Sequence, residues 1–317
     1  MPPPSKMSDY DPRFFRPCIF PMLRRLGYGT RVTINNGVGP DQAEATEFTI
    51  SLSAFDQSGK HLGISPEITR LQPGEIEKLD VDSLLDEHFG LHPDEDVLCI
   101  LHPVPARFEG QTSVEVDPKE LMAHVFVSDD FIEYHQREGG IVTGVAYQTG
   151  LLNDPRSSST RTTVCQAPKV IVSEPVDTMF ALMNVSNRFE YANPVTMNFW
   201  ILGPDGNRVA RSAVEVPPFS YRLVSTTDVL AEAGVLEQYR EDGGMGMFLG
   251  YSKNGTLVPL SLTRNKVSGA IACDHTLPPV FYVTTWGGEK RLQANARLER
   301  EFFAEALAPA PVPVAAR

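Results

Sequence analysis

Apolar and polar residues alternate in many short segments of this chain. Residues 48–55 (FTISLSAF) carry an apolar residue at every second position, which is typical of a half-buried antiparallel strand. Helical spacing predicts a short helix over 81–89, with Asp82 as its N-cap, and a longer helix over 289–307. Further strands are predicted at 31–35, 61–64, 76–79, 97–101, 123–127, 140–147, 179–185, 195–202, 221–225, 246–252, 257–263 and 271–273.

Two stretches of the chain read alike. Residues 54–85 and 201–230 each contain a strand, a turn with Asp and Gly, a second strand, a Pro-marked bend, a third strand and a short helical turn. Pro73 and Pro218 are 145 positions apart, and so are Leu85 and Leu230. This spacing indicates an internal duplication. It predicts an all-β fold of two tandem antiparallel β-sandwich domains, immunoglobulin-like or jelly-roll-like, followed by a C-terminal α-helix.

Breaks in the pattern set the expected domain boundaries. Prolines in the first 29 residues oppose a long helix, while the apolar residues between them favour an arm that docks on a domain or on a partner. A stretch rich in Ser, Thr and Asp after the first domain is typical of a linker. The expected segments are an N-terminal arm (1–29), a first sandwich (30–150), a linker (151–168), a second sandwich (169–286), a helix (287–308) and a disordered tail (309–317).

The net charge of −12 is concentrated in the first domain, where fourteen acids and three bases lie between Asp41 and Asp96. Phosphate binding needs a basic surface, so nucleic acid is not an expected partner. The arm is basic and aromatic, and contact with an acidic membrane surface is an alternative role for it, although it lacks a regular amphipathic helix. No stretch is apolar and long enough to predict a membrane span.

The four cysteines, Cys18, Cys99, Cys165 and Cys273, are far apart and form no CxxC pair. Together with the absence of a recognisable export signal, this spacing predicts reduced thiols and a cytoplasmic location. Histidine, cysteine and charge do not repeat between the two similar halves, whereas the strands and turns do. The shared part is therefore expected to be the scaffold, and function is expected in what the halves do not share.

Histidines and carboxylates offer two candidate metal sites. His88 and His92 have the HxxxH spacing of a zinc pair, but Gly90 should end the helix at Phe89 and separate the two rings. His124 lies in a predicted strand. A second cluster could bind a divalent cation through its carboxylates, although it lacks the spacing of a calcium loop, and consists of Asp129, Asp130, Glu133, His135 and Glu138.

Cys273 and His275 are the strongest candidates for nucleophilic chemistry. Two residues at this spacing share one face of a strand, as a thiol nucleophile and its base would, while Asp274 points to the other face. The sequence places no third group beside them. The common nucleotide-binding and hydrolase motifs do not occur in the sequence. We therefore assign no catalytic residue, metal or cofactor.

These observations favour a non-enzymatic accessory or scaffold subunit that mediates protein–protein assembly, or self-association, through its β-sandwich surfaces and terminal segments. The residues expected to contact a partner are Phe14, Phe15, Phe20, Leu292, Phe302 and Phe303. A metal-assisted enzyme that uses some of the histidines, including His275, is one alternative. The other is a binding protein for a small ligand or carbohydrate, which requires a shared concave face for Tyr191, Phe199, Trp200, Tyr282 and Trp286.

Overall fold

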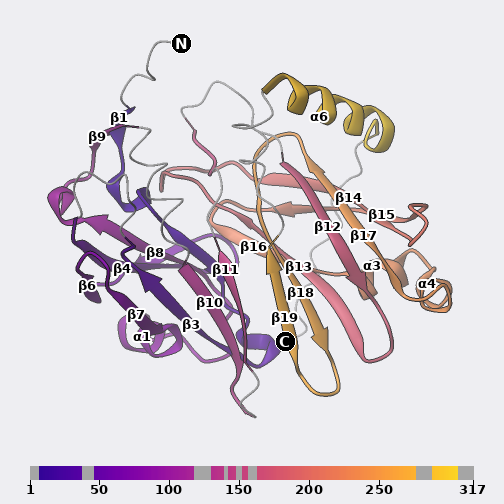
Figure 1. Cartoon of the computed structure of the whole chain (residues 1–317), viewed down its shortest axis with the longest axis horizontal. Helices are drawn as coiled ribbons and strands as arrows, with labels where there is room; N and C mark the ends of the chain where they lie inside the picture. The colour runs from indigo at the N-terminus through magenta and orange to yellow at the C-terminus, as the bar shows by residue number, and fades with distance from the viewer. Residues whose placement is uncertain are drawn as a thin grey trace. The chain divides into compact units, whose positions relative to one another are not determined.

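The protein is described from a computed structural model that covers residues 7–37, 46–117, 130–138, 142–147, 152–155, 163–275 and 288–305. The chain divides into two compact units (Figure 1). Unit 1 comprises Met1–Thr149 together with the short insert Asn187–Glu190, and unit 2 comprises Gly150–Ser186 and Tyr191–Arg317. No helix in the described part of the chain is long and apolar enough to cross a membrane.

Unit 1 contains two antiparallel sheets and a two-stranded ribbon. One sheet has the order β2-β8-β4-β5, with β6 also paired to β4; the second has the order β11-β10-β3-β7; the ribbon joins β1 and β9. The strands are β1 (Met7–Tyr10), β2 (Cys18–Pro21), β3 (Tyr28–Asn35), β4 (Phe48–Phe55), β5 (His61–Ile64), β6 (Thr69–Leu71), β7 (Ile76–Asp80), β8 (Leu98–Pro105), β9 (Val114–Val116), β10 (Asp130–Gln136) and β11 (Val142–Tyr147). The helices are η1 (Pro12–Phe14), η2 (Arg24–Leu26), α1 (Val81–Phe89) and η3 (Ala106–Phe108).

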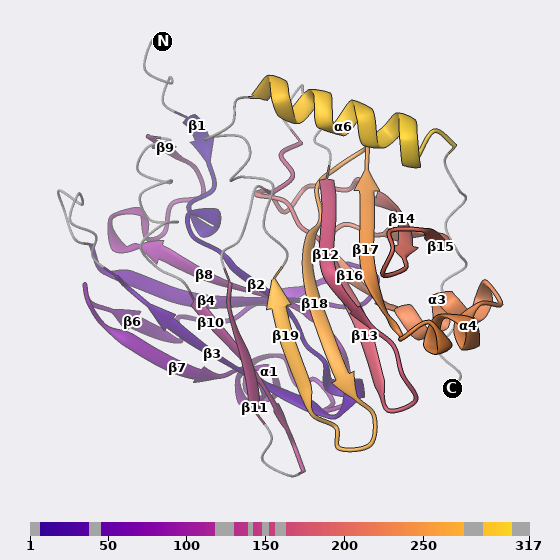
Figure 2. The ribbon, with the colours of Figure 1, turned by 45° about the vertical axis from the view of Figure 1, so that its right-hand side comes forward.

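Unit 2 contains two four-stranded antiparallel sheets, with the orders β12-β17-β14-β15 and β16-β13-β18-β19 (Figure 2). Its strands are β12 (Thr163–Ile171), β13 (Val176–Asn184), β14 (Val195–Leu202), β15 (Arg208–Val216), β16 (Ser220–Ser225), β17 (Met245–Ser252), β18 (Val258–Asn265) and β19 (Ile271–His275). Its helices are α3 (Thr226–Glu232), α4 (Leu236–Glu241) and α6 (Gly288–Phe302). The core between the two sheets includes a column of aromatic rings, Phe180, Phe248 and Phe199, whose neighbouring centroids are 4.2 and 4.8 Å apart.

The two units share one topology. If the eight strands that form the two main sheets are numbered in chain order in each unit, the sheets read 1-6-3-4 and 5-2-7-8 in both, with β6 and the β1–β9 ribbon as additions in unit 1. Consecutive strands mostly cross from one sheet to the other, as in Greek-key and jelly-roll sandwiches. A register shift also recurs at the same place, between Ala54 and Phe55 in β4 and between Ile201 and Leu202 in β14. The predicted all-β fold with two antiparallel sandwiches and a C-terminal helix is confirmed.

A buried asparagine holds three strands together at the same position in each unit. Asn36, directly after β3, donates its amide to the carbonyl oxygens of Thr46 (2.8 Å) and Leu71 (3.0 Å). Asn184, at the end of β13, donates in the same way to Asn193 (3.0 Å) and Val216 (2.9 Å). The backbone carbonyls of Asn36 and Asn184 accept from the amides of Gly74 and Phe219, which occupy equivalent turns.

Those turns explain the repeated prolines. Pro73 and Pro218 each precede a residue with positive φ, Gly74 at 86° and Phe219 at 50°. Glycine adopts this conformation freely, whereas phenylalanine is strained there. Phe219 is held in place by burial, at 3% exposure, and by an edge-on contact with the Tyr191 ring.

Helix α1 spans the expected residues, but its N-cap lies two residues before the expected Asp82. The N-cap is Asp80, which accepts from the Ser83 amide, and Ser225 caps α3 in the same way. Asp82 instead reaches back to β3 and accepts from the Thr30 amide at 2.7 Å, while Arg24 donates to its other oxygen at 2.9 Å. The expected end of α1 at Phe89 is correct, because Gly90 follows in the left-handed conformation.

The first 29 residues are built into unit 1. Strand β2 is the first strand of its sheet and is equivalent to β12 of unit 2. The pairing registers place Cys18 and Cys165 at the same position in the two units, so one cysteine does repeat, contrary to expectation. Phe14, Phe15 and Phe20 are at most 2% exposed and belong to the core of unit 1.

Part of the expected linker is likewise structured. Asn153 is buried in unit 2, where its amide donates to Asn184, Val185 and Thr256 and its side-chain oxygen accepts from the Thr256 backbone amide. Every polar atom of this side chain is therefore satisfied. Strand β12 then begins at Thr163, within the stretch expected to be a linker.

We expect Asn184→Ala to destabilise unit 2 by roughly 2–4 kcal/mol, since it removes two donated hydrogen bonds and leaves buried carbonyls unpaired. Urea denaturation followed by far-UV circular dichroism measures this loss. The matched control is Asn207→Ala, at an exposed turn, which should cost less than about 1 kcal/mol. Equal unfolding midpoints for the two variants would contradict the structural role of Asn184.

Candidate functional site

The outer faces of two equivalent sheets are the most distinctive surfaces of the chain. Within β14, the residues Val195, Met197, Phe199 and Ile201 point into the sandwich core, so Trp200 and Leu202 point outward. The residues of unit 2 on this outer face, here called face 2, are Trp200, Leu202, Arg208, Met247, Leu249 and Tyr251. The equivalent residues of unit 1, here called face 1, are Ser53, Phe55, His61, Leu98, Ile100 and His102.

Strand register fixes this correspondence residue by residue. Phe55 pairs with His61 as Leu202 pairs with Arg208, so His61 and Arg208 are equivalent. On the other side, Ser51 pairs with His102 as Asn198 pairs with Tyr251, which makes His102 and Tyr251 equivalent. Both faces are thus flanked by a nitrogen-bearing side chain on one neighbouring strand and a ring on the other.

Two phenylalanines from outside the sheet cover face 1. Phe14, from η1, meets the His102 ring edge-on at 5.5 Å. Phe189, from the insert Asn187–Glu190, stacks on His61 at 5.0 Å. The Arg13 guanidinium lies 4.5 Å from the centre of the Phe189 ring, a cation–π contact.

Arg188 anchors the same insert within unit 1. Its guanidinium donates to the Asp9 carboxylate at 3.1 Å. Arg188 of the insert therefore binds a carboxylate, and the next residue, Phe189, joins the aromatic cluster on face 1.

His102 is buried beneath these rings and forms two hydrogen bonds. Its Nδ1 lies 2.8 Å from the Arg13 carbonyl oxygen and its Nε2 lies 2.8 Å from Ser53 Oγ. Because the carbonyl can only accept, Nδ1 carries the proton and Nε2 accepts from the serine. Burial lowers the pKa of His102 to about 4, although the bond to the Arg13 carbonyl acts in the opposite direction.

Serine, histidine and an orienting acceptor resemble the parts of a nucleophilic site. Here both Ser53 and His102 are 0% exposed. A substrate cannot reach the serine oxygen in this folded state. The pair therefore links β4, β8 and η1 beneath the covering phenylalanines.

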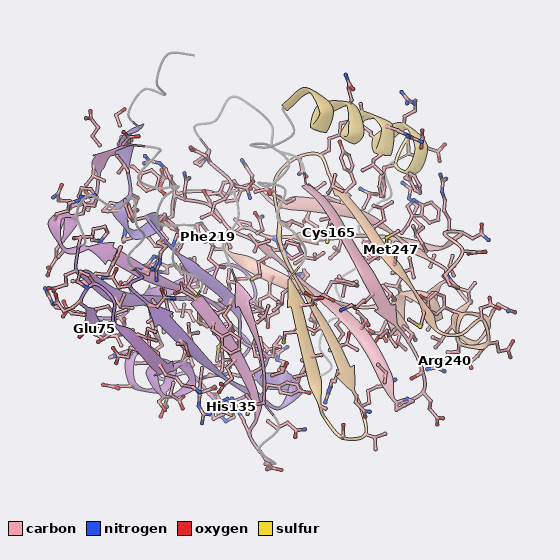
Figure 3. All side chains as sticks on the ribbon, viewed as in Figure 1. Glu75, His135, Cys165, Phe219, Arg240 and Met247 are labelled. Carbon is pink, nitrogen blue, oxygen red and sulfur yellow. The ribbon has the colours of Figure 1, made fainter. Side chains whose placement is uncertain are left out.

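Helix α6 covers face 2. Phe303, directly after the helix, is 6% exposed and stacks on Tyr251 at 5.6 Å, and Leu298 and Phe302 pack on the same cluster. Met247, on β17 and labelled in Figure 3, packs against the same cluster. The Arg208 guanidinium lies 4.3 Å from the centre of the Phe302 ring.

Face 2 also binds the carbonyl end of α6. Trp200 Nε1 donates to the Phe302 carbonyl at 2.8 Å, Arg208 donates to the Glu301 carbonyl at 2.6 Å, and Arg211 donates to the Glu305 carbonyl. The last carbonyls of a helix have no partner within the helix and carry its negative dipole end. Arg208 and the Trp200 indole N–H are chemically matched to two of these helix carbonyls, whereas Arg211 binds the carbonyl of Glu305, which lies beyond the helix end.

The expected metal candidates do not converge. His88 lies at the end of α1, whereas His92 lies beyond Gly90 with a side chain that is 71% exposed. Within β10, Asp130 faces inward and pairs with Arg16 at 3.0 Å, while Glu133 faces outward and pairs with Lys78 at 2.9 Å. Among the described residues, no group of three or more His, Cys, Asp or Glu side chains could hold a metal ion. His124 and Asp129 lie outside the described residues.

The candidate thiol pair Cys273 and His275 lies on β19, and nothing is described of the His275 side chain. Cys273 is half-buried on β19, and Asp274 pairs with Lys169 at 3.5 Å. Burial raises the pKa of the Cys18 thiol, and it also raises that of Cys99. Since a thiolate is the reactive form, these two thiols are poor nucleophiles.

The aromatic residues expected to form one ligand face are divided. Phe199 is 1% exposed in the core, while Trp200 lies on face 2 beneath α6. Tyr191 is buried beside Phe219. Tyr282 and Trp286 lie outside the described residues, and nothing is described of the Leu292 side chain.

Comparison with known proteins gives no family. No family model matches the chain, and no curated protein matches it. A glycosyl hydrolase family 2 member from Bacteroides cellulosilyticus is 9% identical, with a TM-score of 0.17, over 82% of this chain and 27% of that one. A β-glucuronidase from Bacteroides uniformis is 9% identical, with a TM-score of 0.17, over 84% of this chain and 27% of that one. The VP2 subviral particle of infectious bursal disease virus is 10% identical, with a TM-score of 0.16, over 86% of this chain and 72% of that one.

The chain spans about a quarter of the length of the two hydrolases. At TM-scores this low, the similarities support no argument about this chain.

We expect the buried His102 to make unit 1 sensitive to acid. Its pKa is lower in the folded than in the unfolded state, so the unfolded chain binds the extra proton between about pH 6.5 and pH 4. The stability that neutral His102 contributes is complete above pH 6.5 and is lost as pH falls towards 4, by up to about 3 kcal/mol.

The free energy of unfolding at pH 7 and at pH 4.5 tests this. The difference should be smaller for His102→Gln than for the wild type, and unchanged for His92→Gln, which alters an exposed ring. The same pH dependence in all three proteins would exclude His102 as the responsible group.

Proposed function

We propose that this protein is a non-enzymatic assembly subunit whose two equivalent sheet faces bind phenylalanine-bearing segments. The observation that carries the proposal is the equivalence of faces 1 and 2. Each takes up two phenylalanines from segments outside the sheet itself, Phe14 and Phe189 on one face and Phe303 and Phe302 on the other.

The contacts correspond position by position. His102 and Tyr251, at one equivalent position, meet Phe14 and Phe303. His61 and Arg208, at the other, meet Phe189 and Phe302. Different side chains at equivalent positions would allow the two faces to discriminate between different segments.

Of the six residues expected to contact a partner, Phe14, Phe302 and Phe303 lie on these faces. Phe15 and Phe20 lie in the core of unit 1 and are not part of face 1 as defined above. In the isolated chain, segments of the protein itself cover both faces. A partner would therefore have to provide a segment of the same chemistry or receive one of these segments.

A peptide of residues 288–305 (GEKRLQANARLEREFFAE) tests the proposal directly. The receptor is the full chain with Phe302→Ser and Phe303→Ser, which weakens its own α6 contact and leaves face 2 intact. We expect the labelled peptide to bind this receptor in fluorescence anisotropy, and to bind at least about tenfold more weakly when it carries the same two serines, since each buried ring is worth about 1.5–3 kcal/mol.

The wild-type chain, with face 2 already covered, is the matched control and should bind the peptide more weakly than the receptor variant. Equal binding of the native and the serine peptide would contradict the proposal.

A further inference from the structure

The last two turns of helix α6 and the residues that follow contact unit 2. Its described contacts are made by Leu298, Glu299, Phe302 and the residues that follow. Further towards the N-terminus, Gln293, Ala296 and Arg297 are exposed. The contacts described for its last two turns are therefore enough to bind the end of the helix to face 2.

The anchor depends on the chemistry of the helix end, not on the continuity of the chain. Apolar burial of Phe303, the cation–π contact of Arg208 and the three donated hydrogen bonds all involve atoms of residues 298–305. Glu299 adds contacts to Tyr251 and Lys253. Any copy of this segment can satisfy the same groups.

The connection between β19 and α6 contains twelve residues, 276–287. Twelve residues can span roughly 40 Å when fully extended. This length allows the helix to reach a neighbouring molecule. Exchange of an identical element between two copies is a low-cost route to a dimer, because the exchanged contact reproduces every bond of the original one.

We propose that face 2 accepts α6 of a second copy of this chain, so that the protein dimerises by exchange of its C-terminal helices. The proposal rests on the proposed function, because it uses face 2 as the receptor. It names the partner as the chain itself and the recognised element as a helix end with the pattern Leu-x-x-x-Phe-Phe, residues 298–303. The balance between monomer and dimer depends on protein concentration, because exchange replaces an intramolecular contact with an intermolecular one.

Two complementary full-length variants separate exchange from ordinary association. Variant A carries Phe302→Ser and Phe303→Ser, so its α6 is impaired and its face 2 is intact. Variant B carries Trp200→Ala and Arg208→Ala, so its face 2 is impaired and its α6 is intact. Circular dichroism and thermal unfolding first verify that both variants are folded.

In sedimentation equilibrium, we expect A alone and B alone to have the mass of one chain, 35.0 kDa. An equimolar mixture should form a one-to-one complex, because α6 of B occupies face 2 of A. A version of B that also carries Phe302→Ser and Phe303→Ser should not form the complex. Wild-type protein should shift towards twice the chain mass as its concentration increases.

Two outcomes overturn the inference in different ways. If the 288–305 peptide binds A while A and B stay monomeric together at 200 µM, helix exchange is wrong and the binding function of face 2 stands. If neither the peptide nor B binds A, the proposed function fails with it. Association of A with the serine-carrying version of B would show that a surface other than α6 holds the copies together.

Discussion

Apolar side chains on the outer face of a sheet constrain each unit of this protein. A two-layer sandwich buries one face of each sheet, so apolar residues on the opposite face remain in water unless a third element covers them. In unit 2, Leu202, Leu249 and Tyr251 lie on such a face and are at most 5% exposed beneath α6. Covering this surface fixes where the C-terminal helix lies within unit 2.

Both copies have an outer sheet face that another segment of the chain covers, but the covering segments differ between the two. The strand order, the register shift and the buried Asn36 and Asn184 are common to both copies. At the two equivalent positions on these faces, unit 1 carries the buried His102 and the exposed His61, whereas unit 2 carries Tyr251 and Arg208. The two copies thus share these positions, while the side chains at them differ.

Alternation along the sequence was enough to predict β4 and β14, because their core-facing residues are apolar at every second position. The same alternation wrongly predicts that Ser53, a polar residue on the outer face of β4, is exposed to solvent. Its side chain is fully buried. Burial there depends on Phe14 and Phe189, which are distant in sequence and carry no local signal of their destination. Alignment of the two copies strand by strand would have placed His61 opposite Arg208, but it could not have identified the covering segments.

Hydrogen–deuterium exchange measured by mass spectrometry tests the equivalence of the two faces most directly. The account predicts that Phe302→Ser with Phe303→Ser accelerates exchange in β14 and β17 and leaves β4 and β8 unchanged, because local protection depends on the cover above each sheet. Phe189→Ser should produce the opposite pattern, with faster exchange in β4 and β8 alone. Unchanged exchange in both variants, or the same increase in all four strands, would contradict the account.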